Sequence, residues 1–130
     1  MTRFLTAAIL VCAAVPALGQ APQPAERACL EQINMYGFDP VPGNRALIVT
    51  DIRHRRYRVS FMGPCYNLQW HLGVRFKTFG TSNLSCVSRG DQVLLRDAIG
   101  PSSCIGQSVE YQTPAMDQAD AQAKAAKAAH

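Results

Sequence analysis

Several features that would indicate a metal centre or a membrane protein are missing from this chain of 130 residues. There is no Cys-x-x-Cys and no His-x-x-His spacing, so no metal-ligand motif is present and we expect neither a metal nor another cofactor. No hydrophobic run in the sequence is long enough to span a bilayer. The formal net charge is +4, which is too small to support an electrostatic argument about the whole domain.

The N-terminal segment, residues 1–19, has the layout of a secretory signal peptide. A short basic start precedes the apolar run Phe4–Val15, which is shorter than the roughly 20 residues of a membrane-spanning helix. Ala17 and Gly19 supply the small side chains that precede a cleavage site. We therefore expect cleavage near Gly19 and a periplasmic or secreted protein without a transmembrane segment. An uncleaved N-terminal anchor is the alternative.

We expect one folded domain between two unlike ends. Residues 20–27, rich in Pro, Ala and Gln, predict a flexible lead-in, and residues 28–113 predict a single β-rich domain. Residues 114–130 are alanine-rich, with Asp117 and Asp120 early and lysines late, which suits a helix dipole. Because this tail has no apolar stripe, it is predicted to be a frayed helix or a disordered segment. A role of the tail in assembly is a further possibility.

The cysteine count predicts disulfides. Cys12 lies in the signal segment, so cleavage leaves an even number of cysteines in an oxidising compartment. Three pairings of these four residues are possible. We expect the pairs Cys65–Cys86, bracketing a long alternating stretch, and Cys29–Cys104, joining the first and last strands.

Alternating and β-branched stretches separated by turn residues predict six or seven short strands. The fold class is therefore all-β, a small antiparallel barrel or sandwich stapled by two disulfides, with a flexible or helical C-terminal tail. Loops or turns are predicted at Tyr36–Asn44, Gly80–Ser85 and Gly100–Ser103. The expected strands are Ala28–Met35, Ala46–Thr50, Tyr57–Phe61, Tyr66–Lys77, Gln92–Arg96 and Cys104–Gln112.

Two of these segments carry more detailed predictions. In the Ala46–Phe61 hairpin, Tyr57, Val59 and Phe61 should face the core, and the residues between them should face water. Tyr66–Lys77 alternates over its whole length and predicts one long strand, with Tyr66 and the other apolar residues facing the core. A short helical turn beginning at Asn67 is the alternative.

The cysteines and strand residues together have a familiar arrangement. Tyr-x-Val-x-Phe leads into Gly-Pro-Cys-x-x-Leu (Gly63–Leu68), and a cysteine precedes the Gly-Asp-x-Val strand start (Gly90–Val93). With Ala28-Cys29 at the start and Cys104-Ile105 near the end, this resembles an uncharacterised family of small exported proteins of Gram-negative bacteria, a domain of unknown function. The resemblance covers Ala28–Tyr111. It implies a periplasmic or secreted location and brings no catalytic residues.

A basic cluster at the tip of the hairpin is the candidate binding site. Arginine makes bidentate, charge-assisted contacts with phosphate and carboxylate, so a tip with several arginines could bind an anionic group. Anionic lipid, lipopolysaccharide and an acidic protein are the expected partners. Nucleic acid is not, because no aromatic stacking face accompanies the charges. The alternative is a solvated hairpin that protects a sheet edge. The cluster consists of Arg53, His54, Arg55, Arg56 and Arg58.

Other polar residues offer no catalytic constellation, so we expect a binding or structural module and not an enzyme. The Arg89–Asp91 tripeptide matches an adhesion motif but is ordinary turn chemistry. Turn and cap roles also explain Asp51 and Asp97. The alternative function is a small periplasmic enzyme or metal carrier that uses His71 and neighbouring polar groups.

Overall fold

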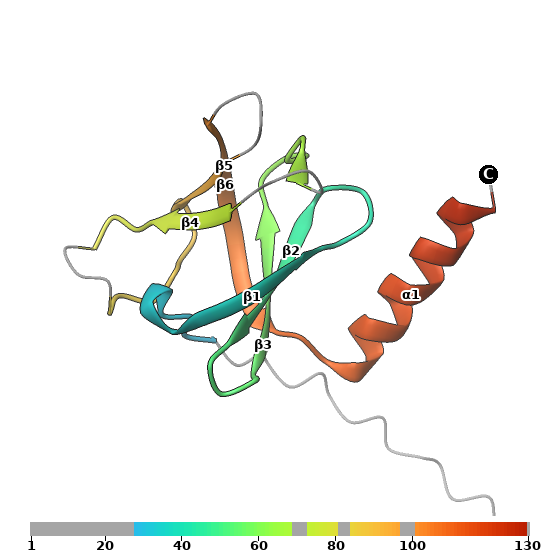
Figure 1. Cartoon of the computed structure of the whole chain (residues 1–130), viewed down its shortest axis with the longest axis horizontal. Coiled ribbons are helices and arrows are strands. Elements are labelled where there is room, and N and C mark those ends of the chain that lie inside the picture. Colours follow the sequence, from blue (N-terminus) through green and yellow to red (C-terminus); the bar gives the residue numbers. More distant parts are fainter. Residues whose placement is uncertain (1–27, 69–72, 81–83, 97–100, 130) are drawn as a thin grey trace, which may run out of the picture.

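The computed structural model describes residues 28–68, 73–80, 84–96 and 101–129. A strongly curved six-stranded antiparallel sheet nearly closes into a barrel, and one helix stands beside it (Figure 1). The strand order is β1-β2-β3-β6-β5-β4. The all-β prediction is therefore confirmed. The elements are the 3-10 helix η1 (Gln32–Asn34), β1 (Met35–Pro40), β2 (Ala46–Asp51), β3 (Arg56–Phe61), β4 (Gly73–Lys77), β5 (Gln92–Arg96), β6 (Pro101–Tyr111) and α1 (Pro114–Ala128).

The β2–β3 hairpin forms as its alternation predicts. Tyr57, Val59 and Phe61 are buried in the main core, and Arg56 on the opposite face is exposed. β2 pairs with β3 from Ala46↔Ser60 to Thr50↔Arg56. Because side chains alternate across a strand, this register places the apolar set of β3 inside the barrel. Other buried members of the core include Leu30, Leu47, Val49, Leu68, Phe76, Val93 and Leu95.

β6 joins the two halves of the barrel. Its C-terminal half pairs with β3, from Tyr57↔Tyr111 to Phe61↔Gly106, and its N-terminal half pairs with β5. The register shifts beside Gly106, whose N–H donates to the Asp91 carbonyl at 2.9 Å. This bond ties the bend in β6 to the turn that precedes β5.

Two disulfides are present, as the cysteine count predicts, but both predicted pairings are wrong. Cys29 pairs with Cys86, and Cys65 pairs with Cys104. Cys65 follows β3, and the antiparallel β3–β6 register brings Cys104 to that end of β3. An isolated antiparallel β-bridge pairs Glu31 with Cys86, and this places Cys29, two residues before Glu31, close to Cys86. These are contacts between distant segments, which cysteine spacing does not encode.

The first strand is displaced from its prediction. Ala28–Met35 is not a strand, since it contains an isolated bridge and η1, and β1 instead occupies Met35–Pro40, where a loop was predicted. β1 lies at an edge of the sheet. Proline is tolerated in an edge strand because its missing N–H leaves no interior ladder bond unmade. Pro40 is therefore compatible with the edge strand β1.

The prediction of one long strand over Tyr66–Lys77 is wrong. Tyr66 and Asn67 form a turn, and β4 begins only at Gly73. The Tyr66 side chain is exposed instead of facing the core. The chain turns here because Cys65 is held by its disulfide and by its N–H, which donates to the Asn44 carbonyl at 2.7 Å. The helical alternative begins at Asn67, which lies in this turn. Most of it falls on residues 69–72, which lie outside the described residues, so that alternative stays a prediction.

Near the C-terminus the start of one strand differs from the prediction, and one of the two alternatives for the tail is confirmed. β6 begins at Pro101, inside the predicted turn Gly100–Ser103. The tail takes the helical alternative: α1 begins after Thr113, whose hydroxyl accepts from the Met116 N–H at 3.3 Å. No residue of α1 within the described structure is buried. Hydrophobic burial therefore contributes little to holding this helix against the barrel.

The two disulfides should differ in their contribution to stability. Closing loops of 57 and 39 residues stabilises by about 4 kcal/mol each on the chain-entropy model. Cys65 is fully buried, whereas Cys29 and Cys86 are exposed. Cys65→Ala/Cys104→Ala should therefore cost about 1 kcal/mol more than Cys29→Ala/Cys86→Ala, because it also removes packed core volume. Urea unfolding of both double variants measures the difference, and the reverse order would contradict the packing argument.

Candidate functional site

The tip of the β2–β3 hairpin is organised by the buried side chain of Asp51. Its Oδ1 accepts from the backbone N–H groups of Arg53, at 2.9 Å, and Arg55, at 2.8 Å. Its Oδ2 accepts from Arg55 Nε, at 2.8 Å, and from the Tyr57 hydroxyl, at 3.2 Å. The Asp51 carbonyl accepts from the His54 N–H, and His54 has a left-handed backbone conformation with a φ of 62°. A carboxylate cap thus closes this turn in place of an Asn-Gly pair.

These contacts determine the ionisation of Asp51. Burial alone would raise its pKa, but the hydrogen bonds from Arg55 and Arg53 outweigh burial and lower the pKa below the ordinary value of 3.8. The carboxylate is therefore ionised at neutral pH. Burial and the neighbouring Asp51 charge raise the pKa of Tyr57, so its phenol stays protonated and can donate to that carboxylate.

The predicted basic cluster is divided into two parts by its ion pairs. Arg55 pairs with Asp51 at 2.8 Å. Arg56 and Arg58, which we call the strand pair, are held by acidic residues of α1. Arg53 and His54 are exposed and make no ion pair within the described part of the chain. We call Arg53, His54 and the exposed side of Arg55 the turn surface.

α1 binds the strand pair through matching spacings. Asp117 and Asp120 lie three residues apart on one helix face, and Arg56 and Arg58 lie two apart on one strand face. Arg56 Nη1 donates to Asp117 Oδ2 at 2.7 Å, and Arg58 contacts both carboxylate oxygens of Asp120. The Gln112 side-chain amide donates to both aspartates, at 3.2 and 3.1 Å. We call this set of contacts the helix clasp.

The clasp holds only the first half of the helix. A cavity of about 490 Å³ lies between the β1–β2 connection and the C-terminal half of α1, where Lys124 and Lys127 line it. Sequence reasoning assigned no partner to the two aspartates. Their spacing of three residues in an alanine-rich helix was the available signal.

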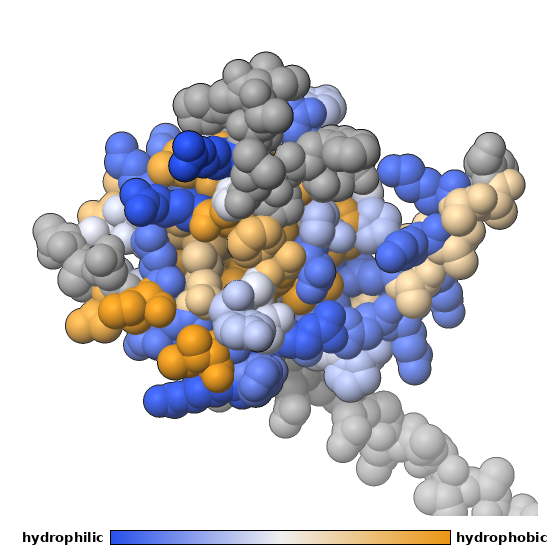
Figure 2. Space-filling view, viewed as in Figure 1, coloured by the Kyte–Doolittle hydropathy of each residue, from blue (hydrophilic) through white to orange (hydrophobic). Residues whose placement is uncertain are grey.

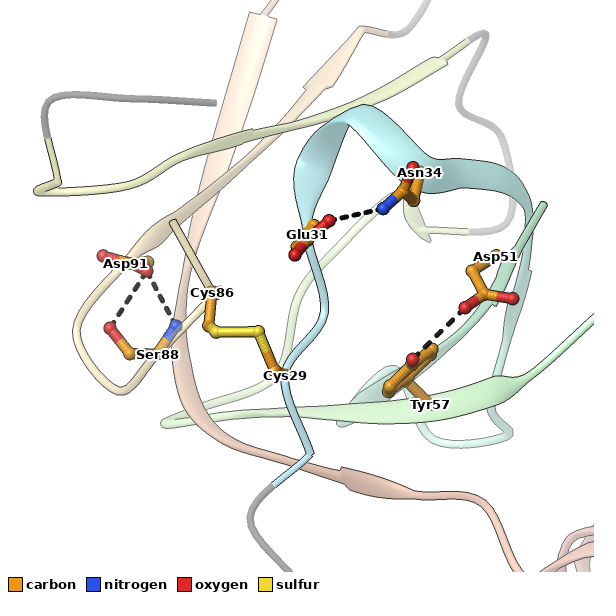
Figure 3. The surroundings of a disulfide bond; sticks show 8 residues. All are labelled: Cys29, Glu31, Asn34, Asp51, Tyr57, Cys86, Ser88 and Asp91. Atoms are coloured by element: carbon orange, nitrogen blue, oxygen red, sulfur yellow. Dashed lines mark hydrogen bonds between the residues drawn. A yellow bond between two sulfur atoms is a disulfide. The ribbon is translucent and has the colours of Figure 1, made fainter. Parts of the chain in front are cut away.

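A small polar pocket adjoins the turn surface. It has a volume of about 250 Å³, and its walls come from the N-terminal segment, the β2–β3 turn and the end of β6. Figure 3 shows Glu31 with Asn34 and Asp51 with Tyr57 as two hydrogen-bonded pairs near the Cys29–Cys86 disulfide. The lining residues are Cys29, Leu30, Glu31, Asn34, Asp51, Arg53, Arg55, Tyr57 and Tyr111. The two arginine side chains of the turn surface thus also border this pocket.

Asp91 has a structural role like that of Asp51. Its side chain is buried and accepts from the N–H groups of Ser88, at 2.7 Å, and Phe79, at 3.1 Å. Gly90 before it has a φ of 93°, which glycine adopts without strain. The Arg89–Asp91 tripeptide is therefore a turn whose carboxylate faces inward, as the turn interpretation predicts.

The remaining candidates are not placed by the structure. His71 and Asp97 lie outside the described residues, so the enzyme or metal-carrier alternative stays a prediction. Within residues 28–68, 73–80, 84–96 and 101–129, no group of three or more His, Cys, Asp and Glu side chains is arranged to hold a metal ion. In the same ranges no helix has the length and apolar character needed to cross a membrane.

Comparison with known proteins gives a family and no function. A family model described as a family of unknown function (DUF6491) matches residues 1–129. No curated protein matches the chain, and no solved structure matches it. The geometry of the hairpin tip is therefore the basis for any functional conclusion.

Replacing Asp51 should destabilise the whole hairpin. Asp51→Asn removes the charge that four donors share, and we expect the free energy of unfolding to fall by roughly 2–3 kcal/mol at neutral pH. The lowered pKa means that this stabilisation is present above the ordinary value of 3.8 and is lost as the pH falls through the lowered value. Urea unfolding of wild type and variant should therefore converge in acid. The exposed Asp39→Asn is the control, and an equal effect of both variants would contradict the role of Asp51.

The helix clasp can be tested without disturbing the core. Asp117→Asn/Asp120→Asn should release α1, which would lower the heteronuclear NOE of its backbone amides while the unfolding midpoint barely changes. Gln118→Lys/Ala121→Lys raises the net charge equally at exposed helix positions and should leave α1 bound.

Acid should weaken the clasp in the wild type. The hydrogen bond from Gln112, with the contacts of Arg56, lowers the pKa of Asp117 below the ordinary 3.8. The Asp117 contact therefore persists at neutral pH and is lost only as the pH falls through that lowered value. Because the Arg56–Asp117 ion pair is partly exposed, high salt should weaken it too. Unchanged helix dynamics in the aspartate variant would contradict the clasp.

Proposed function

The chain belongs to DUF6491, a family of unknown function, and we propose that it is an exported binding module that contacts anionic envelope groups through the turn surface. The observation that carries the proposal is that Arg53 and His54 are exposed on a turn fixed from within by Asp51, and that neither has an ion-pair partner among the described residues. Arg55 adds a guanidinium that is half exposed and oriented by the same carboxylate.

The fixed turn favours binding because little conformational freedom remains to be lost there. Two backbone N–H bonds to the Asp51 carboxylate and the His54 N–H bond to the Asp51 carbonyl hold the backbone of the turn, and the same carboxylate orients the Arg55 side chain. Arginine side chains on such a support can make charge-assisted contacts with phosphate or carboxylate oxygens. Phosphate groups are shared by anionic phospholipids and lipopolysaccharide, so both are candidate ligands.

Two observations support an exported location. The chain forms two disulfides, which persist in oxidising compartments such as the periplasm or the extracellular space. The first nineteen residues have the composition of a signal peptide, with cleavage expected near Gly19. The proposed location is therefore periplasmic or secreted.

The proposal is tested with soluble polyphosphate as the probe. Arg53→Ser should weaken the affinity of the oxidised protein about fivefold at low salt, since a basic residue near an anionic surface contributes about 1 kcal/mol. Arg75→Ser removes the same charge from an exposed position on β4 and should change the affinity much less. Wild-type binding should weaken as salt is added.

Titration calorimetry over a salt series measures both effects. Wild-type binding that does not respond to salt would contradict the proposal. An equal loss of affinity in Arg53→Ser and Arg75→Ser would also contradict it, because binding would then depend on net charge and not on the turn surface.

A further inference from the structure

Three large apolar side chains are exposed around the turn surface. Ile33 is 63 % exposed, Tyr36 74 % and Ile52 58 %. The Ile52 N–H donates to the carbonyl of Asn34, the residue after Ile33, at 2.8 Å. The Tyr36 ring lies edge-on to His54, with 6.0 Å between ring centroids. Figure 2 shows hydrophobic and hydrophilic surface side by side in the region where η1 and the β2–β3 turn lie.

The backbone accounts for this exposure at two of the positions. The β1–β2 register shifts between Met35 and Gly37, which pair with Asp51 and Thr50, so Tyr36 is the extra residue of a β-bulge. A bulge changes the direction of a side chain, and here it leaves Tyr36 out of the core. Ile52 directly follows the buried Asp51 in a turn that this carboxylate holds, so its side chain stays outside next to Arg53.

This combination of side chains identifies one kind of partner. A soluble polyanion would neutralise the cations but would leave the aliphatic side chains in water. A bilayer with anionic headgroups accommodates both, because phosphates meet the cations while apolar side chains enter the acyl boundary. Tyrosine suits that boundary because its ring is apolar and its hydroxyl polar.

We propose that Ile33, Tyr36 and Ile52 insert into the interface of an anionic lipid bilayer while Arg53 and His54 contact its phosphates. The proposal rests on the anion binding proposed above and names the partner that the turn surface meets. The strand pair takes no part, because α1 already occupies it.

The experiment uses the oxidised protein, residues 20–130. The vesicles consist of neutral lipid, with or without a fraction of phosphatidylglycerol. Sedimentation with vesicles measures membrane binding, and calorimetry with soluble polyphosphate measures anion binding. Ile33→Ser/Ile52→Ser should lower binding to anionic vesicles about tenfold or more, and its affinity for polyphosphate should equal that of the wild type. Both residues are exposed, so the unfolding midpoint should not fall.

The matched control is Met62→Ser/Ile105→Ser. These side chains are 50 % and 47 % exposed, and they adjoin each other through the Met62 N–H bond to the Ile105 carbonyl. They lie beyond the opposite end of β3 from the turn. This variant should bind vesicles as the wild type does. A loss equal to that of Ile33→Ser/Ile52→Ser would overturn the proposed surface.

The remaining outcomes separate the two proposals. Binding to polyphosphate without binding to anionic vesicles would overturn the bilayer proposal and leave anion binding standing. Binding to purified lipopolysaccharide but not to phospholipid vesicles would likewise overturn it in favour of that ligand. Equal binding to neutral and anionic vesicles would overturn the bilayer proposal. No binding to polyphosphate, to vesicles or to lipopolysaccharide would overturn the anion-binding function and the bilayer proposal together.

Discussion

The buried carboxylate of Asp51 is the interaction on which the structure of the candidate binding site depends. A charge removed from water must be compensated, and four donors from the next six residues do this. Two of the donors are backbone N–H groups, so compensating the charge also fixes the turn. A third is Tyr57 from the core, which ties the turn to the barrel. The exposed cations are therefore presented by a rigid support.

Local patterns predicted the elements whose form depends on neighbouring residues. The alternation of Tyr57, Val59 and Phe61 predicted β3 and its buried face, because one face of that strand meets the core. The cysteine count predicted two disulfides but not their pairing. Pairing follows from β6 lying against β3, which brings Cys104 to Cys65 and is a property of the topology. No local pattern encodes that neighbourhood.

The same distinction explains what was foreseen of the candidate site. Arg53, His54, Arg55, Arg56 and Arg58 stand close together in the sequence, so a basic tip was predictable. The division of this cluster into the turn surface and the strand pair was not predictable. The partners of Arg56 and Arg58 lie about sixty residues further along the chain and reach them only when α1 folds back. Tyr36 was expected in a loop, and its exposure beside His54 comes from a bulge that arises only when β1 pairs with β2.

The division of charge also limits how a ligand can approach. A polyanion lying along the whole hairpin would have to displace Asp117 and Asp120 from the strand pair, and would compete with two contacts already made within the chain. A planar anionic surface meeting the turn end has no such competition, since the turn surface carries no acidic helix. The apolar side chains lie at that same end, on η1, β1 and the turn. Charge and hydrophobicity therefore both favour approach of a ligand at the turn end. Approach along the whole hairpin would cost more free energy, because it would break the ion pairs between the strand pair and α1.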